Sequence, residues 1–310
     1  MRSSNRFASA AFALLLYTVA VVLWGAFVRA SLSGDGCGAH WPLCNGVAIP
    51  VEPSTKTLIE LTHRTTSGLA WIWTLLMWVI ALRQFPRGHA TRAAAGWSLF
   101  FMSTEALVGA GLVLFRMVAA NPSTARAAWM AAHLINTFLL LAALTWLALS
   151  ARREEGLRFP RDRQSRWLFG GAALVLLFVG VSGAVAALGD TLFPAVGFTQ
   201  GLREDFSSSS HLFLRLRMWH PVLAVIGSGY LIWLATLLLR RSSGASIRAL
   251  PVALGTLVLV QIGVGLLNVA LLAPVWLQLG HLLLADATWI TLAWLALSSP
   301  AAISGANLIP

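Results

Sequence analysis

Long apolar segments alternate with short polar ones along the whole chain. A helix needs about 20 mostly apolar residues to cross a hydrocarbon core of about 30 Å, and eight segments reach that length. Because unpaired backbone groups are costly in lipid, each such segment is predicted to be a membrane-spanning helix. The predicted helices cover residues 7–30, 58–82, 93–117, 127–150, 167–189, 215–239, 249–272 and 275–298. The predicted fold class is therefore an all-α integral membrane protein.

Composition agrees with this prediction and excludes an ordinary soluble domain. Of 310 residues, 58% are hydrophobic and 11% are charged, and the mean hydropathy is +0.77, whereas soluble domains carry about a quarter charged residues. The net charge is +11, but the arginines occur in clusters between apolar segments rather than along one stripe. We therefore expect membrane lipid, and no nucleic acid, as a partner. The first apolar segment is longer than that of a signal peptide, so we interpret it as a mature helix.

Orientation follows from the excess of basic residues in cytoplasmic loops. An N-terminus in the cytoplasm places fourteen of the 22 Lys and Arg residues inside. Both termini are then cytoplasmic, and the two longest loops, residues 31–57 and 190–214, lie at the outer face of a bacterial inner membrane. Residues 151–165 form an Arg-rich cytoplasmic linker.

The two halves of the chain, residues 1–150 and 166–310, can be aligned with each other, which indicates an internal repeat. The matched positions, displaced by 148 to 157 residues, are Gly25 with Gly180, Val108-Gly109 with Val264-Gly265, His63 with His220, His133 with His281, and Trp146–Ser150 with Trp294–Ser298. Four helices per half make both halves run in the same direction, as a parallel repeat. We therefore predict two pseudo-symmetric four-helix bundles.

Four histidines fall inside predicted helices at one depth, about 10 Å below the outer ends of the even-numbered helices: His63, His133, His220 and His281. One such residue could be a packing histidine, but four at the same depth favour a shared function. Within each bundle the two histidines can face each other, as the axial ligands of a haem iron must. Zinc fits less well, because two histidines per half leave a tetrahedral site incomplete. The sequence predicts one haem site per half.

The halves differ beside the first histidine of each pair. Glu60 precedes His63 by three residues and shares its helix face, whereas the equivalent position in the second half is Arg217. Near a haem, Glu60 could accept a proton or stabilise a developing cation; alternatively, it forms a structural ion pair with Arg64 or Lys56. Arg217 suits a haem propionate, because a guanidinium pairs bidentately with a carboxylate. This asymmetry suggests chemistry in the first half and a permanent electron-transfer haem in the second.

Two cysteines, Cys37 and Cys44, have six residues between them in a loop that is rich in Gly and Pro. The outer face of a bacterial membrane permits a disulfide there, with two free thiols as the alternative. Such a bridge either staples the loop or takes part in redox transfer or in ordering a substrate entrance.

Five further polar residues carry weaker signals. His40, His89 and His211 fall in predicted loops and are expected to be solvated. Glu105 and Asp286 lie within predicted helices, closer to the midplane. They are interpreted as hydrogen-bonded buried groups or as parts of a proton path, without a predicted partner.

In combination, these features resemble the haem A synthase family over nearly the whole chain. The residues that carry the resemblance are Glu60, His63 and Arg64 on the second predicted helix, His133 on the fourth, His220 on the sixth, His281 on the eighth, and the pair Cys37 and Cys44. The resemblance implies oxidation of the C8 methyl of haem O to a formyl group through a hydroxymethyl intermediate. The product, haem A, is a cofactor of terminal oxidases.

The resemblance also implies roles for single residues. His220 and His281 would bind a resident haem b, and Glu60 would be needed for turnover. His63 and His133 would flank the haem O substrate beside Arg64. Implied partners are the haem O synthase that supplies the substrate and an electron donor, and a homo-oligomer is compatible with the sequence.

One departure from the family pattern concerns the second half. Some members carry another cysteine pair in its outer loop, but none occurs between Asp190 and Leu214 here. Two rival functions remain open. A dihaem b-type cytochrome that only relays electrons would also need two histidine pairs, and a transporter could be built on a parallel repeat.

Overall fold

The computed structural model describes residues 2–153, 156–160, 162–241 and 245–298, which form helices and connecting loops without strands. Eight helices in this part are long and apolar enough to cross a membrane. The prediction of an all-α membrane protein with eight spans is therefore confirmed. Residue 1 of the predicted first half, residues 154–155 and 161 of the predicted linker, and residues 242–244 and 299–310 of the predicted second half lie outside the described residues.

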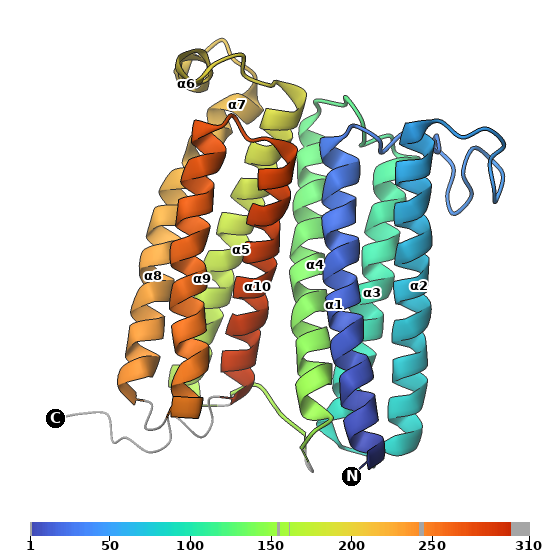
Figure 1. Cartoon of the computed structure of the whole chain (residues 1–310), viewed down its shortest axis with the longest axis vertical. Helices are drawn as coiled ribbons and strands as arrows, with labels where there is room; N and C mark the ends of the chain where they lie inside the picture. Colours follow the sequence, from blue (N-terminus) through green and yellow to red (C-terminus); the bar gives the residue numbers. More distant parts are fainter. Residues whose placement is uncertain (1, 154–155, 161, 242–244, 299–310) are drawn as a thin grey trace.

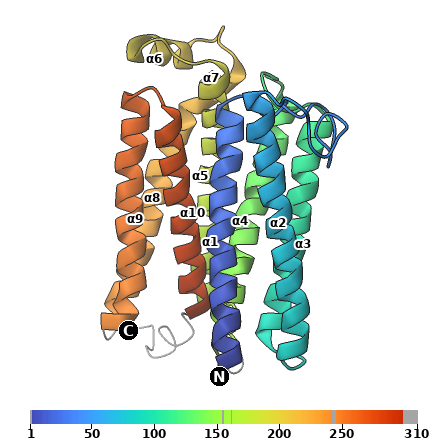
Figure 2. The same ribbon diagram turned by 45° about the vertical axis from the view of Figure 1, so that its right-hand side comes forward.

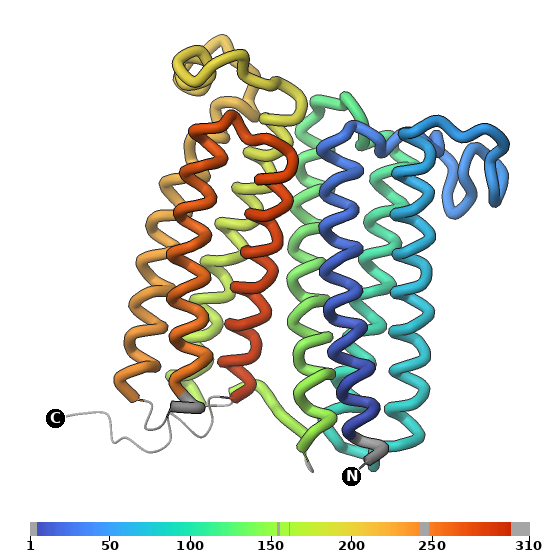
Figure 3. Tube along the Cα trace, in the orientation of Figure 1, coloured from blue at the N-terminus to red at the C-terminus, as the bar shows by residue number. Residues whose placement is uncertain are grey.

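The first four spans form one bundle (Figure 1). They are α1 (Arg2–Ala30), α2 (Thr55–Gln84), α3 (Ala90–Leu114) and α4 (Thr124–Ser150). The second bundle contains α5 (Arg163–Leu192), α8 (Trp219–Arg241), α9 (Ala245–Ala270) and α10 (Val275–Ser298). The first spans of the two bundles, α1 and α5, both begin at the end of the molecule where α10 ends (Figure 3).

Side-chain caps explain why several helices begin earlier than the apolar pattern predicts. Ser54 and Ser123 accept hydrogen bonds from backbone N–H groups of α2 and α4, so these helices start three residues before the predicted positions 58 and 127. Asp162 caps α5 by accepting the Ser165 N–H at 2.8 Å. That hydrogen bond keeps the pKa of Asp162 below its ordinary value.

The sixth span is interrupted near its outer end. Residues Leu212–Arg217 form the short helix α7, and α8 begins after Met218. Pro221 has no N–H for the carbonyl of Arg217, four residues earlier, which removes one helical hydrogen bond at this position. Because of this break, α7 ends at Arg217.

The loop predicted at residues 190–214 is largely helical, so this prediction was wrong. It contains α6 (Phe198–Phe206) and the start of α7, which lie over one end of the second bundle (Figure 2). Phe198, Leu202 and Phe206 recur every four residues, which places them on one face of α6. Following the predicted orientation, we call this end, which also carries the loop with Cys37, the outer end.

The bundles pack side by side through α1 and α4 on one side and α5 and α10 on the other (Figures 1 and 2). Trp289 of α10 stacks on Phe138 of α4 with ring centres 4.9 Å apart, and its indole N–H donates to the Phe138 carbonyl at 2.5 Å. Trp289 thereby belongs to the hydrophobic core of the first bundle. The interface between the halves is thus a packed core.

The three loop histidines differ in their environments. His40 is exposed, as predicted. His89 is only 7% exposed, so its predicted solvation was wrong. It caps α3 by accepting the Thr91 N–H, and its other ring nitrogen lies 3.2 Å from the Arg153 carbonyl. His211 is half-buried and caps α7. Backbone capping, which hydrophobic periodicity does not report, explains the buried position of His89.

Candidate functional site

All four embedded histidines line one cavity of about 1420 Å³ whose walls come from both bundles. Pockets for a single small-molecule ligand usually measure about 300–1,000 Å³, so this cavity has room for more than one ligand. The predicted site residues that line it are His63, His133, His220, His281, Glu60, Arg64 and Arg217. The fold therefore brings together residues that are up to 221 positions apart in sequence (His281 minus Glu60).

His220 of α8 and His281 of α10 face each other. Their ring centres are 6.4 Å apart and their planes are nearly perpendicular, at 89°. A metal–imidazole nitrogen bond measures about 2.0–2.1 Å and the ring centre lies about 1 Å behind the nitrogen, so two imidazoles on opposite sides of one metal have centres about 6 Å apart. The observed separation fits two axial ligands of one iron.

The polar partners of these two histidines are neutral. Ser182 of α5 lies 3.0 Å from Nδ1 of His220, and the amide nitrogen of Gln261 of α9 lies 3.3 Å from Nε2 of His281. Nδ1 of His281 is buried and has no hydrogen-bond partner among the described residues. The pair therefore leaves imidazole nitrogen available to a ligand in the cavity, as a haem site requires.

Each embedded histidine packs against a glycine on the preceding span. The contact can be measured from a Cβ atom added at the glycine to Cε1 of the histidine. This distance is 2.9 Å for Gly25 and His63, and 3.0 Å for Gly183 and His220. It is 3.2 Å for Gly265 and His281, and 3.8 Å for Gly109 and His133. Any larger side chain at Gly25 or Gly183 would push the imidazole aside. The sequence alignment pairs Gly25 with Gly180, whereas the glycine against His220 is Gly183.

Glu105 of α3 has partners that the sequence did not suggest. Its carboxylate lies 3.5 Å from Nδ1 of His133 and accepts hydrogen bonds from Asn136 and Thr137, both on α4. Glu105 and Gln261 are displaced by 156 residues, the same displacement that relates Gly109 to Gly265. Extending that alignment from Gly109 by one helical turn would have matched Glu105 with Gln261, the residue that contacts His281 in the second half.

Glu60 is 3% exposed and is held by hydrogen bonds from two residues. Its Oε2 accepts the backbone N–H of Cys37 at 2.8 Å, and its Oε1 accepts from Nε of Arg64 at 3.1 Å and from a terminal guanidinium nitrogen of the same residue. The ion pair with Arg64, one of the two interpretations of Glu60, is therefore present. Cys37 and Cys44 form a disulfide, which confirms that prediction.

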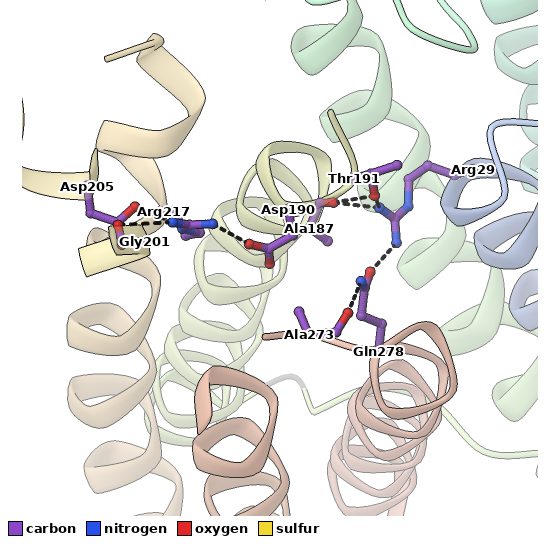
Figure 4. Close-up of polar contacts among 9 residues, drawn as sticks. All are labelled: Arg29, Ala187, Asp190, Thr191, Gly201, Asp205, Arg217, Ala273 and Gln278. Carbon is purple, nitrogen blue, oxygen red and sulfur yellow. Dashed lines mark hydrogen bonds and ion pairs between the residues drawn. The ribbon is translucent and has the colours of Figure 1, made fainter. Parts of the chain in front are cut away.

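Arg217 binds two carboxylates that the sequence did not assign to it (Figure 4). It donates to Asp190 of α5 at 2.6 Å and to Asp205 of α6 at 2.6 and 2.9 Å. The predicted contact between Arg217 and a haem propionate stays a prediction, and a propionate there would compete with two carboxylates. The ion pairs fasten α6 to the break between α7 and α8.

Two arginines that line the cavity were not recognised from the sequence, and Asp286, which was interpreted as a hydrogen-bonded buried group or part of a proton path, is buried but lacks the expected hydrogen bond in the part of the chain that the structure describes. Arg29 of α1 and Arg126 of α4 line the cavity. Asp286 of α10 is fully buried, and neither of its carboxylate oxygens has a hydrogen-bond partner among the described residues. Within the same part of the chain, no group of three or more His, Cys, Asp or Glu residues could hold a metal ion.

Comparisons with known proteins give one family match and relatives whose names refer to haem. A family model described as COX15-CtaA, cytochrome oxidase assembly protein, matches residues 8–293. A Thermus thermophilus protein named protoheme IX farnesyltransferase is 46% identical over 295 residues, which are 95% of this chain and 48% of that protein. This chain thus spans about half the length of that relative. Proteins named heme A synthase from Bacillus mycoides and Bacillus cereus are 41% identical over 95 residues, covering 31% of this chain and 30% of theirs.

Proposed function

Because the chain belongs to the COX15-CtaA family of cytochrome oxidase assembly proteins, we propose that it is a haem A synthase. It oxidises the C8 methyl of haem O to a formyl group through a hydroxymethyl intermediate. The observation that carries the proposal is the single cavity that joins two histidine pairs to one buried carboxylate, Glu60. The relatives named heme A synthase support the same reaction.

The first bundle binds the substrate. His63 and His133 flank haem O, with Arg64 beside them, and Glu60 lies one helical turn nearer the outer end than His63. Conversion of a methyl to a formyl group with water as oxygen source releases four electrons and four protons, so an external electron acceptor must take up the electrons. The Cys37 N–H and the Arg64 guanidinium hold the Glu60 carboxylate in place, where it stabilises positive charge on the substrate or accepts one of these protons.

The second bundle would hold a resident haem b. His220 and His281 would bind its iron, for which their ring separation of 6.4 Å is suitable, and Arg217, which lines the same cavity, would be available to its propionates. A bound haem supplies one-electron redox chemistry that no protein side chain provides. Ser182 fixes the ring orientation of His220.

The partners and location follow from the same proposal. A redox partner that takes up the released electrons and a haem O synthase that supplies the substrate serve the enzyme; with water as oxygen source this partner is an acceptor, in place of the electron donor expected from the sequence. The relative named protoheme IX farnesyltransferase, twice as long as the matched region, supports a link to farnesylated haem. We place the protein in a bacterial inner membrane with both termini in the cytoplasm and both haem sites toward the outer face.

Two other functions are less well supported. A farnesyltransferase that uses a prenyl diphosphate needs carboxylates to hold a divalent cation, and the described residues contain no group of three or more candidate ligands. A dihaem cytochrome that only relays electrons needs no carboxylate in one half. The two donors that hold Glu60 favour an enzyme over a relay.

Pigment extraction tests the proposal directly. The protein is purified from membranes of a host that makes haem O, and its pigments are separated by chromatography. Haem b together with haem O, the hydroxymethyl intermediate or haem A supports the proposal, with the His63→Ala variant as the control that loses the substrate. Haem b alone would indicate a relay, and farnesylation of added haem b would indicate a transferase.

A further inference from the structure

Arg29 reaches from the first bundle into the second (Figure 4). It lies in the last turn of α1, donates to the Ala187 carbonyl and to Thr191 of α5, both at 2.7 Å, and donates to Gln278 of α10 at 2.9 Å. All three acceptors are neutral. Asp190 also attracts Arg29, but this carboxylate is hydrogen-bonded to Arg217.

Arg126 lies in the first turn of α4 and is 2% exposed. One terminal nitrogen donates to the carbonyls of Ala119 and Asn121 at 2.5 and 2.9 Å. Its Nε atom is buried and has no hydrogen-bond partner among the described residues. Because a buried guanidinium with an unused donor is costly, this side chain lacks an acceptor that a ligand could provide.

Both arginines line the cavity, and Arg29 lies close enough to Arg126 to experience its charge. Within the described part of the chain, neither forms an ion pair. The other two arginines that line the cavity, Arg64 and Arg217, each have carboxylate partners. Of the four described arginines that line the cavity, Arg29 and Arg126 are therefore the two whose charge an anionic ligand could balance.

The pair lies on the outer side of the first histidine pair. Arg29 follows Gly25, against which His63 packs, by four residues and so lies one turn farther out on the same helix face. Arg126 precedes His133 by seven residues, about 10 Å along α4 on the same face. Arg126 thus lies on the outer side of His133. The guanidinium of Arg29 reaches the same cavity from the bundle interface, where it is hydrogen-bonded to α5 and α10.

We propose that Arg29 and Arg126 form a carboxylate-binding site that holds the two propionates of the substrate haem. The inference rests on the proposed function and adds the residues that orient the substrate. Haem is the ligand chemistry that fits, because its two propionates leave the same edge of the ring and a guanidinium pairs with a carboxylate through two hydrogen bonds.

Orientation of the propionate edge restricts which methyl groups can react. The two pyrrole rings that carry propionates also carry the C5 and C8 methyls, whereas the C1 and C3 methyls belong to the other two rings. With the propionates held at the outer end, the C5 and C8 methyls lie toward the level of Glu60, one turn outward from His63. Arg29 and Arg126 are thus specificity-determining residues. The enzyme can then distinguish C8 from C5 because the farnesyl chain is attached on the C8 side of the ring.

Binding of esterified substrate tests the site without relying on turnover. Purified protein in phosphatidylcholine nanodiscs is titrated with haem O and with its dimethyl ester, and the dissociation constants are read from the absorbance change. We expect the wild type to bind the free acid about tenfold to a hundredfold more tightly than the ester. Arg29→Gln and Arg126→Gln should lose most of this preference while ester binding stays unchanged. Arg116→Gln, at an exposed arginine outside the cavity, should keep it.

The outcomes separate the site from competing explanations. Equal affinity of the wild type for acid and ester, or full preference in both glutamine variants, would overturn the proposal. If a glutamine variant fails to bind even the ester, the Lys variant at the same position is measured instead, because it keeps the charge but not the planar pair of donors. A reduced preference of that variant for the free acid over the ester supports the site, and an unchanged preference overturns it. Loss of the wild-type preference in nanodiscs that contain phosphatidylglycerol would assign the arginines to lipid phosphate instead.

The same measurements distinguish this inference from the proposed function. Preferential binding of the free acid without any oxidation of haem O would leave the carboxylate site standing and reject the synthase. Haem A formation with unchanged affinities and unchanged methyl selectivity in Arg29→Gln and Arg126→Gln would leave the synthase standing and reject the site.

Discussion

The backbone N–H of Cys37 donates a hydrogen bond of 2.8 Å to Oε2 of Glu60, so the disulfide loop and the proposed catalytic carboxylate form one unit. Arg64 adds a second connection, because it binds Glu60 and also donates to the carbonyls of His40 and Leu43 at 2.5 and 2.6 Å. Any change that loosens the loop should therefore move the carboxylate, although the disulfide itself does not line the cavity.

Replacement of both Cys37 and Cys44 by Ser should slow haem A formation by about tenfold, because a carboxylate whose donor moves is less well positioned. Closure of so short a loop contributes about 2 kcal/mol of stability, so amide hydrogen exchange of residues 37–45 should also become faster. Haem content should not change. Complete loss of turnover would instead identify the cysteines as redox partners in the reaction, and an unchanged rate would contradict the coupling of loop and carboxylate.

Glu60→Gln should leave the amounts of bound haem b and haem O unchanged but reduce haem A output by about 10²–10⁴-fold. The amide can still accept the Cys37 N–H, but it carries no charge and is a poor proton acceptor. The measurement is chromatography of extracted haems against time. Glu52→Gln, at an exposed position in the same outer loop, is the matched control, and wild-type output from the Glu60 variant would reject the catalytic role.

The two histidine pairs should be separable by pigment content. His220→Ala or His281→Ala should remove most of the resident haem b absorbance, because loss of one axial ligand leaves the iron with a single protein bond. His63→Ala or His133→Ala should retain that absorbance and lose haem O. The reversed result would exchange the roles that we propose for the two bundles.

The sequence predicts the parts of this structure that depend on local composition. Apolar length alone locates eight spans, and an ionisable residue in such a span is rare enough to single out the four histidines. Contacts between distant segments carry no such signal: Arg29 meets Gln278 across the bundle interface and Arg217 meets Asp205 across a turn. Neither the break before α8 nor helix α6 follows from hydropathy, because both lie within or beside apolar sequence.

The assignment of the glycine against His220 shows a different limit. Gly180 and Gly183 are three residues apart and lie on nearly the same face of α5, so a repeat alignment cannot choose between them. Packing makes the choice: Gly180 lies against Phe138 and Leu134 of α4, and Gly183 lies against the imidazole. Two glycines of one helix thus serve the bundle interface and the haem site separately.

That separation leads to a prediction for α5. In Gly183→Ala, the new Cβ would lie 3.0 Å from Cε1 of His220, so the ring must move away from Ser182 and from its position opposite His281. Overpacking of this kind costs about 1–3 kcal/mol, and resident haem b should fall by about tenfold or more.

Gly170→Ala is the matched control in the same helix, since nothing lies within 4 Å of its added Cβ. Because alanine favours helix more than glycine by about 1 kcal/mol, the control should be as stable as the wild type and should keep its haem. The absorbance ratio of haem to protein in purified samples measures both. Equal ratios for the two variants would mean that the contact between Gly183 and His220 does not set the ligand geometry.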